Sequence, residues 1–543
     1  MSKAVQPFWI EGRAIALDVN GPTDVPYNAE RAKDFETIGG FEVIAQTARE
    51  NPDKVAVDDG QDRLTYAQFL DRVYELAESL DKLTEDRSIV ASIIPNNVAA
   101  PIVIMACALS RRILVPIDAA HPLERQQAIF SESGAAVVLL AKDKNADLSF
   151  VPATIPRVVV DPLSPSNTKY TARDYDQHAP LFVTFTSGST GRPKGVVSGG
   201  RYGGIALRQF IDMFHLNSSD VVLGVASLST GGARDAFAAL GVGATIRLVD
   251  LRAGGIGEML KVMSESKVTV LSFVPSALRA MLSVDGVGQA FKCLRVLDLH
   301  GERILATDIA LFRRKLPRNC HISVTMGSIE AGAVFSWFVR DDKITGTVVP
   351  VGYLIPGRRV ALLDEQGVPV ADGEVGELFA RGPMALGAWQ NGCRVPGPFL
   401  PDPDDPSSSI YPMRDLVRKR SDGLFEYVGR KDRKVKVRGL WADLSEIEAA
   451  LQMMQGVADA AAIAENENTP NEQLVAFIVM APGVRPPSAS DVRRAVARET
   501  AEHMAPAIVR VLDFIPRLAN FKPDLMRLSS LSHVSRGTPA DDP

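Results

Sequence analysis

The chain has 543 residues, of which 46% are hydrophobic and 23% are charged, and its formal net charge is −5. This length is ample for large hydrophobic cores but too long for a single one, so we expect roughly two or three folding units. The acidic balance and the lack of a long lysine- or arginine-rich block argue against a nucleic-acid partner. The four cysteines are scattered without a CxxC pair, which argues against a disulfide framework or a zinc site.

Neither the start of the chain nor its apolar stretches carry a targeting or membrane signal. The opening sequence MSKAVQPFWIEGR lacks the apolar segment of a secretory signal. The longest apolar stretch, residues 98–109, falls short of the roughly 20 residues that a membrane span needs. We therefore expect a cytoplasmic protein without a membrane partner.

The first half of the chain alternates between predicted helices and short apolar strands. Thr65 and Gln68 form a capping-box start, and apolar residues at helical spacing follow as far as Leu80. Short apolar runs then recur at residues 89–94, 136–140, 158–160, 181–185, 221–226, 245–249, 268–273 and 294–299. With helical segments between many of them, this pattern predicts an α/β fold with a doubly wound parallel sheet.

The composition and the apolar pattern of the sequence change near residue 345. Residues 346–381 are rich in glycine and in short alternating runs, which predicts antiparallel strands in a small barrel or sheet. Residues 392–409 are rich in proline and aspartate and are predicted to form a loop. From about residue 433 we expect a compact α+β unit with helices at 444–454 and 491–503 and strands at 460–464 and 474–480. The end of the chain is expected to be a disordered tail.

The run TFTSGSTGRPKG, residues 184–195, concentrates hydroxyls, glycines and one lysine in a tight turn after a predicted strand. Glycines let backbone N–H groups approach an oxyanion closely, and hydroxyls add donors. Lys194 adds a mobile positive charge. Because Gly195 stands where a Walker motif has Ser or Thr, this is a different kind of polyphosphate turn.

Other motifs occur in a fixed order around this turn. They are Leu64-Thr65-Tyr66, Val115-Pro116-Ile117-Asp118 with His121-Pro122 and Glu124-Arg125, Gly327-Ser328-Ile329-Glu330, Gly376-Glu377-Leu378, Tyr411 to Asp415-Leu416, Gly429-Arg430-Lys431-Asp432, Val435-Lys436-Val437-Arg438-Gly439 with Glu446-Ile447-Glu448, and Asn520-Phe521-Lys522. Together with the turn, this set resembles the adenylate-forming superfamily of acyl-CoA synthetases, luciferases and peptide-synthetase adenylation domains. The Val-Pro-Ile-Asp…His-Pro…Glu-Arg segment resembles the peptide-synthetase branch most. The resemblance extends from about residue 40 to about residue 530.

The resemblance implies the fold and the reaction. It implies an N-terminal adenylation core over residues 1–431 with a β-rich subdomain at about 345–431. A small α+β lid domain at 432–530 and a tail at 531–543 would complete the chain. The superfamily activates a carboxylate with ATP and Mg²⁺, releases pyrophosphate, and then transfers the acyl group to a thiol after the lid has turned.

The resemblance also assigns roles to individual residues. Lys522 would bridge the substrate carboxylate and the α-phosphate, Glu330 would bind magnesium, and Asp432 would be the hinge. Lys436 and Gly439 would face the site during thiolation. The residues that would hold the nucleotide are Thr186, Ser187, Gly188, Ser189, Thr190, Gly191, Lys194, Met326, Asp415 and Arg430. By composition alone, residues 431–434 are also compatible with an ordinary solvated charge run.

Four positions depart from the superfamily pattern. Met326 replaces the aromatic residue that stacks on adenine, although a thioether can also pack against a base. Ile329 replaces a threonine before the motif glutamate. Arg414 and Phe521 replace the glycines that precede the ribose aspartate and the lid lysine. These substitutions raise the alternative of a degenerate, non-catalytic relative.

The predicted acyl pocket departs further. Thr230 falls where an aspartate clamps the ammonium of an α-amino acid, and threonine cannot neutralise that charge. Arg234 could receive an acidic group, unless it pairs with Asp235 or faces away, whereas Asp298 could hold an amino group further along the substrate. The predicted lining comprises Thr230, Gly231, Arg234, Ser272, Asp298, His300, Thr325, Ala333 and Val334. A dicarboxylic acid and a β- or ω-amino acid both remain possible substrates, and a long fatty acid is disfavoured.

The thiol acceptor is open at this stage. Only 543 − 522 = 21 residues follow Lys522, too few for a carrier domain, so we expect a stand-alone enzyme that loads a carrier protein in trans. The alternative is an acyl- or aryl-CoA ligase, in which coenzyme A supplies the thiol.

Overall fold

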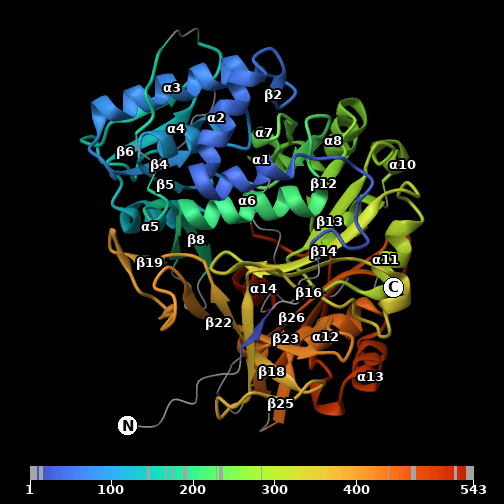
Figure 1. The fold of residues 1–543 in the computed structure, drawn as a ribbon. Coiled ribbons are helices and arrows are strands. Elements are labelled where there is room, and N and C mark those ends of the chain that lie inside the picture. Colours follow the sequence, from blue (N-terminus) through green and yellow to red (C-terminus); the bar gives the residue numbers. More distant parts are fainter. Residues whose placement is uncertain are drawn as a thin grey trace, which may run out of the picture. The chain divides into compact units, whose positions relative to one another are not determined.

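The computed structural model describes residues 9–11, 16–142, 147–164, 168–173, 176–187, 193–227, 229–230, 237–282, 284–437, 440–465, 473–518 and 523–532. The chain forms two compact units (Figure 1). The first comprises residues 1–361, 379–413 and 420–426, and the second comprises 362–378, 414–419 and 427–543. The chain passes from one unit to the other within strands β17 (Arg359–Leu363), β18 (Val375–Gly382), β22 (Ser409–Lys419) and β23 (Phe425–Arg430).

The first unit contains an eight-stranded sheet in the order β20-β19-β9-β8-β5-β4-β6-β7. Its strands are β4 (Ile89–Ile93), β5 (Ile113–Pro116), β6 (Val137–Ala141), β7 (Arg157–Val160), β8 (Pro180–Ser187), β9 (Pro193–Gly199), β19 (Gly387–Gln390) and β20 (Cys393–Val395). The strands from β8 to β7 run parallel, and β9, β19 and β20 extend the sheet with antiparallel pairs.

A nine-stranded sheet in the same unit has the order β16-β15-β14-β13-β12-β10-β11-β2-β3. Its strands are β2 (Val55–Asp58), β3 (Arg63–Thr65), β10 (Val221–Gly224), β11 (Thr245–Leu248), β12 (Val270–Phe273), β13 (Val296–His300), β14 (His321–Ser328), β15 (Gly332–Phe338) and β16 (Tyr353–Leu354). The six central strands are parallel, whereas β3, β15 and β16 are antiparallel edges.

Helices pack on both faces of these sheets. They are α1 (Ala29–Asp34), the π-helix η1 (Phe35–Gly39), α2 (Gly40–Glu50), α3 (Tyr66–Leu83), α4 (Ala99–Leu109), α5 (Leu123–Ser133), α6 (Gly200–Phe214), α7 (Phe237–Gly241), α8 (Leu251–Ser266), α9 (Pro275–Leu282), α10 (Val287–Ala290) and α11 (Ala306–Arg313). One core joins α2, α3, α4, α6 and α7 to strands of both sheets, which places this helical layer between them (Figure 1). A second core packs α8 to α11 on the other face of the nine-stranded sheet.

The predicted loop at 392–409 contains β20 and the short strand β21 (Leu400–Pro401), so the loop prediction is wrong at these positions. Strand β20 pairs back on β19 through a turn at Asn391 and Gly392, whose φ angles are 48° and 74°. Asn-Gly with two positive φ angles is a favoured hairpin turn. This Asn-Gly pair lies just before the proline-rich run on which the loop prediction was based.

The second unit has a three-stranded sheet in the order β26-β27-β28 and a β24-β25 hairpin. Its elements beyond residue 430 are η4 (Lys431–Arg433), β24 (Lys434–Val437), β25 (Leu440–Asp443), α12 (Leu444–Gln452), β26 (Val457–Glu465), β27 (Gln473–Met480), α13 (Ala489–Glu499), η5 (Glu502–Met504), β28 (Ile508–Leu512) and α14 (Leu525–Ser532). The predicted helix at 491–503 begins earlier, because Ser488 caps it by accepting from the N–H of Asp491. In the stretches that the structure describes, no helix is long and apolar enough to cross a membrane.

Candidate functional site: a phosphate hairpin, a carboxylate turn and a polar strand ladder

The strands on either side of the predicted phosphate turn form a hairpin. Strands β8 and β9 are antiparallel, with Thr186 opposite Lys194. The Thr186 hydroxyl donates to the carbonyl of Lys194 over 3.4 Å, and the Lys194 side chain is exposed. A Cβ at Gly195 would lie 2.6 Å from the Cβ of Trp389, so a glycine is required there. The structure thus places Lys194 at the mouth of a closely packed hairpin.

Several predicted site positions lie outside the described residues. They are Gly188, Ser189, Thr190, Gly191, Gly231, Arg234, Gly439 and Lys522. For Ser187 and Lys436, the structure describes the backbone on β8 and β24.

The predicted magnesium ligand Glu330 lies in the turn between β14 and β15, and its side chain is half-buried. Three backbone contacts hold the turn. The hydroxyl of Tyr202 donates to the Ile329 carbonyl over 2.9 Å, the Ala331 N–H donates to the Ser328 hydroxyl over 3.1 Å, and the Ala385 N–H donates to the Glu330 carbonyl over 2.9 Å. The carboxylate of Glu330 is therefore carried on a fixed backbone, with contacts from α6 and from the segment before β19.

The turn also explains a glycine of the motif. A Cβ at Gly327 would lie 2.1 Å from the carbonyl oxygen of Gly332, and Gly332 itself has a φ of 73°. The pairing of β14 with β15 shifts between Met326 and Gly327. Met326, the predicted adenine contact, is half-buried immediately before this irregularity.

The predicted pocket residues on β12, β13 and β14 form a polar ladder on one face of the nine-stranded sheet. Ser272, Asp298 and Ser323 are lateral neighbours in the parallel register. Asp298 accepts three hydroxyl hydrogen bonds: from Ser272 over 2.8 Å, from Ser323 over 2.7 Å and from Thr325 over 2.9 Å. The Thr325 hydroxyl is also 3.2 Å from that of Ser336 on β15.

Ser323 and Ser336 were not predicted as site residues. Ser323 and Thr325 alternate with Ile322 and Val324, a strand-like pattern that could have found the first of them. The predicted residues His300, Ala333 and Val334 lie nearby in register: His300 pairs with Thr325, and Ala333 pairs with Gly327. Val334 is fully buried, whereas His300 is half-buried.

Thr230 closes a short turn beside the undescribed part of the pocket loop. Its hydroxyl and its N–H donate to the Ser227 carbonyl over 2.8 Å and 2.9 Å. Ser229 donates to Asp118 over 3.4 Å, and Asp118 forms an ion pair with Arg252 at 3.0 Å. The Val-Pro-Ile-Asp motif therefore holds the start of the pocket loop through its aspartate.

In the second unit, Asp415, Arg430 and Asp432 are joined. The Arg430 guanidinium donates to both oxygens of Asp432 over 2.8 Å and to Asp415 over 3.2 Å. The hydrogen bond to Asp432 raises the pKa of Arg430 further above its ordinary range. Burial by itself raises the pKa of Asp432, but Arg430 outweighs this effect and holds that pKa below its ordinary value. Asp432 is therefore a charged, paired residue at the start of η4.

Arg414, which precedes Asp415, has a φ of 65°. This is the left-handed region that glycine adopts at little cost and an arginine does not. The departure from glycine noted in the sequence therefore falls on a position that requires glycine-like backbone geometry.

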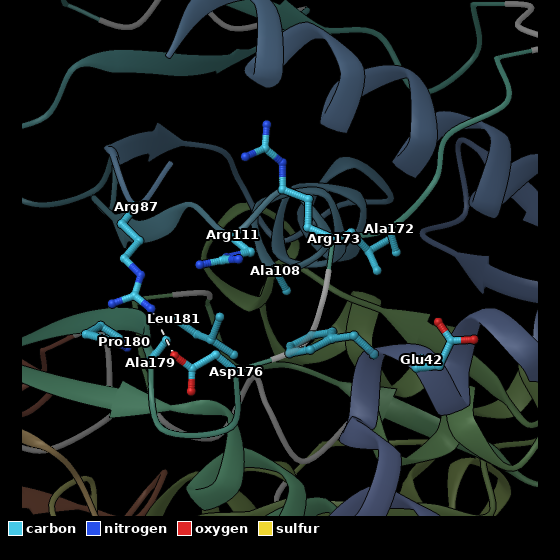
Figure 2. A pocket seen from close by; sticks show the side chains of 12 residues that line it. Glu42, Arg87, Ala108, Arg111, Ala172, Arg173, Asp176, Ala179, Pro180 and Leu181 are labelled. Carbon is cyan, nitrogen blue, oxygen red and sulfur yellow. Dashed lines mark hydrogen bonds and ion pairs between the residues drawn. The ribbon is translucent and has the colours of Figure 1, made fainter. Parts of the chain in front are cut away.

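A cavity of about 40 Å³ lies elsewhere in the first unit, away from these residues (Figure 2). Three arginines line it, and each is already neutralised: Arg87 pairs with Asp176 at 2.9 Å, Arg111 with Asp86 and Arg173 with Asp81. It contains none of the predicted site residues.

Comparisons with known proteins agree with the motif order. The AMP-binding enzyme family matches residues 44–389, and the AMP-binding enzyme C-terminal domain matches residues 446–522. Tyrocidine synthase 3 of Brevibacillus parabrevis is 26% identical over 89% of this chain, which spans only 8% of that protein. Novobiocin biosynthesis protein H of Streptomyces niveus is 28% identical over 92% of this chain and 85% of its own length.

Solved structures share the fold. The anthranilate CoA ligase AuaEII, in complex with anthranoyl-AMP, superposes with a TM-score of 0.78 at 20% identity, over 91% of this chain and 97% of that one. The four-domain nonribosomal peptide synthetase AB3403, bound to AMP and glycine, gives 0.75 at 20% identity over 96% of this chain and 37% of that one. The predicted α/β fold with its added C-terminal domain is confirmed. The chain belongs to the AMP-binding enzyme family, in the adenylate-forming superfamily of AMP-forming ligases that its motifs predict.

Proposed function

We propose that this chain activates a carboxylic acid with ATP and then transfers the acyl group to the phosphopantetheine thiol of a separate carrier protein. In the first step, a carboxylate oxygen attacks the α-phosphorus, the bond to pyrophosphate breaks, and an acyl adenylate forms. In the second, the thiol sulfur attacks the acyl carbon, its proton passes to solvent, and AMP leaves. The ordered motif set, from the hairpin at Lys194 to Lys522, is the observation that carries the proposal.

The first step brings two anions together, so neutralisation of charge is the main task of the site. Lys194 and Thr186, with the turn between their strands, would hold the β- and γ-phosphates. Lys522 would bridge the attacking carboxylate and the α-phosphate. Asp415 would accept from the ribose hydroxyls, and Arg430, hydrogen-bonded to it, would orient it.

Magnesium fits the residues that are present. Mg²⁺ is commonly held by one or two carboxylates together with the phosphates of its nucleotide. Glu330, half-buried on a turn held by three backbone contacts, supplies such a ligand. Among the described residues no group of three or more His, Cys, Asp or Glu side chains could hold a metal by itself. The ion would supply positive charge against the phosphate oxygens.

Carboxylate-dependent release of pyrophosphate, screened over amino, β-amino, hydroxy, aryl and dicarboxylic acids, tests the first step. Lys522→Ala should slow adenylation by orders of magnitude and change ATP affinity less, because this contact strengthens as charge develops. Lys33→Ala, at an exposed lysine of α1 paired with Glu30, is the control. Unchanged adenylation in Lys522→Ala would overturn its assignment, and inactivity with every acid would favour the degenerate-relative alternative.

The acceptor is tested in a second assay. A carrier protein bearing phosphopantetheine and free coenzyme A are offered separately to enzyme, ATP and the active acid. We expect the carrier to be loaded, in keeping with the peptide-synthetase-like early motifs and with the similarity to tyrocidine synthase 3. Acyl-CoA as the preferred product would instead support the alternative, a CoA ligase, with which this chain shares its fold.

A further inference from the structure

The polar ladder lies where an apolar sheet face gives way to polar residues. Val270 and Val296, two residues before Ser272 and Asp298 on the same strands, belong to the core beneath α6. The change occurs toward the carboxyl ends of parallel strands, which is where open α/β sheets bind ligands. Asp298 is 4% exposed at the base of this polar patch. Ser272 and Thr325 are half-buried, so part of each side chain stays accessible.

The direction of the hydrogen bonds is fixed by chemistry. A carboxylate accepts and cannot donate, and a hydroxyl has one proton. Ser272, Ser323 and Thr325 must therefore each donate that proton to Asp298. After doing so, the oxygens of Ser272 and Thr325 have only lone pairs to offer to a guest.

The patch is also negatively charged. Within the stretches that the structure describes, the partners of the Asp298 carboxylate are the three hydroxyls, and no lysine or arginine forms an ion pair with it. Three hydroxyls disperse this charge but do not cancel it. A buried carboxylate of this kind favours a cationic or hydrogen-bond-donating neighbour and disfavours a second anion.

We propose, resting on the function proposed above, that the Asp298 ladder selects carboxylic acids that carry an amino group away from the α-carbon. The amino group donates to the oxygens of Ser272 and Thr325, and Asp298 supplies the charge. At Thr230, where an α-ammonium would need a carboxylate, the side chain is a neutral hydroxyl bonded to the Ser227 carbonyl, and it supplies no negative charge. A dicarboxylic acid, the alternative that depends on Arg234, would be repelled by the negative charge of the Asp298 ladder.

Pairs of acids that differ only in the amino group provide the test. Each pair exchanges NH₂ or NH₃⁺ for CH₃: β-alanine against butanoate, and 3-aminobenzoate against 3-methylbenzoate. We expect the amino member of at least one pair to be preferred about ten- to a hundredfold in kcat/KM for pyrophosphate release, the size of a hydrogen bond to a charged group. Succinate should be the poorest aliphatic substrate.

Asp298→Asn removes the charge and keeps the shape, so the ratio of kcat/KM between the amino member and the CH₃ member should fall to about one. Thr325→Val keeps the charge and removes one acceptor, and it should reduce the preference partially. Circular dichroism and thermal unfolding show whether each variant folds. If Asp298→Asn does not fold, Thr325→Val and the acid pairs with the wild-type enzyme still decide whether the ladder selects an amino group.

Binding of the same radiolabelled acids, measured by equilibrium dialysis without turnover, separates this inference from the proposed function. A binding preference for the amino member supports the ladder even in a chain that releases no pyrophosphate. Equal binding of both members, a preference for succinate, or an unchanged preference in Asp298→Asn overturns the inference and leaves adenylation standing.

Discussion

Arg414 illustrates how one backbone angle contributes to stability. Its φ of 65° is costly for any residue with a Cβ, by roughly 1 kcal/mol, and its side chain is exposed. We expect Arg414→Gly to be about 1 kcal/mol more stable than Arg414→Ala, because both lose the same side-chain contacts and only glycine relieves the strain. Urea unfolding of the two variants measures the difference, and equal stability would show that the position is not strained.

His121 predicts a dependence of stability on pH. Burial lowers the pKa of its imidazole from 6.5 to about 4, with Arg125 and Arg252 adding to this effect and Asp118 opposing it. The unfolded chain therefore takes up a proton near pH 6.5, and the folded chain does so only near pH 4. The free energy of unfolding should be unaffected by this group above pH 6.5 and should fall by about 1–2 kcal/mol as the pH drops toward 4.

His121→Gln removes this titration. Between about pH 6.5 and about pH 4.5 the urea midpoint of wild type should fall more steeply than that of the variant, and above about pH 7 the two slopes should agree. Parallel slopes over the whole range would contradict a buried, neutral His121.

At the scale of one element, α3 depends on its first turn. Thr65 accepts from the N–H of Gln68, and the Gln68 side chain accepts from the Thr65 N–H over 2.9 Å, which closes the predicted capping box. Since α3 packs its apolar face into the first core, Thr65→Ala should cost about 1 kcal/mol of unfolding free energy. Gln61→Ala, exposed just before β3, is the matched control and should change nothing measurable by urea unfolding.

Individual strands also show where a sequence pattern suffices to predict secondary structure. The strands at 89–93 and 137–141 match the predicted apolar runs at 89–94 and 136–140, because a strand buried on both faces is mostly apolar. Strand β14 was not predicted, since His321, Ser323 and Thr325 interrupt its apolar run, and the face that Ser323 and Thr325 occupy carries the polar ladder. Its hydrogen-bond partners are set by neighbouring strands, which local periodicity does not report.

At the scale of the whole molecule, the proposed hinge at Asp432 can be tested through the two half-reactions. Proline fixes φ and removes the backbone donor. Asp432→Pro should leave adenylate formation within a few-fold of wild type and slow thioester formation by at least about tenfold, as expected when a conformational step is impaired. Asp432→Ala, which loses the pairing with Arg430 but keeps backbone freedom, is the control. Equal loss of both half-reactions would contradict a selective hinge.

The sequence by itself determined the family, the fold class and the capped helix α3, because motif order, strand hydrophobicity and capping are local patterns. It also indicated Asp298 as a pocket residue and Arg414 as a departure from glycine. Only the tertiary structure decided that Asp298 receives three hydroxyl protons and that Arg414 adopts a left-handed backbone. The donors to Asp298 come from two other strands, up to 27 positions away along the chain. The contact between these donors and Asp298 depends on the parallel register of neighbouring strands, which cannot be read from the sequence pattern of any one strand.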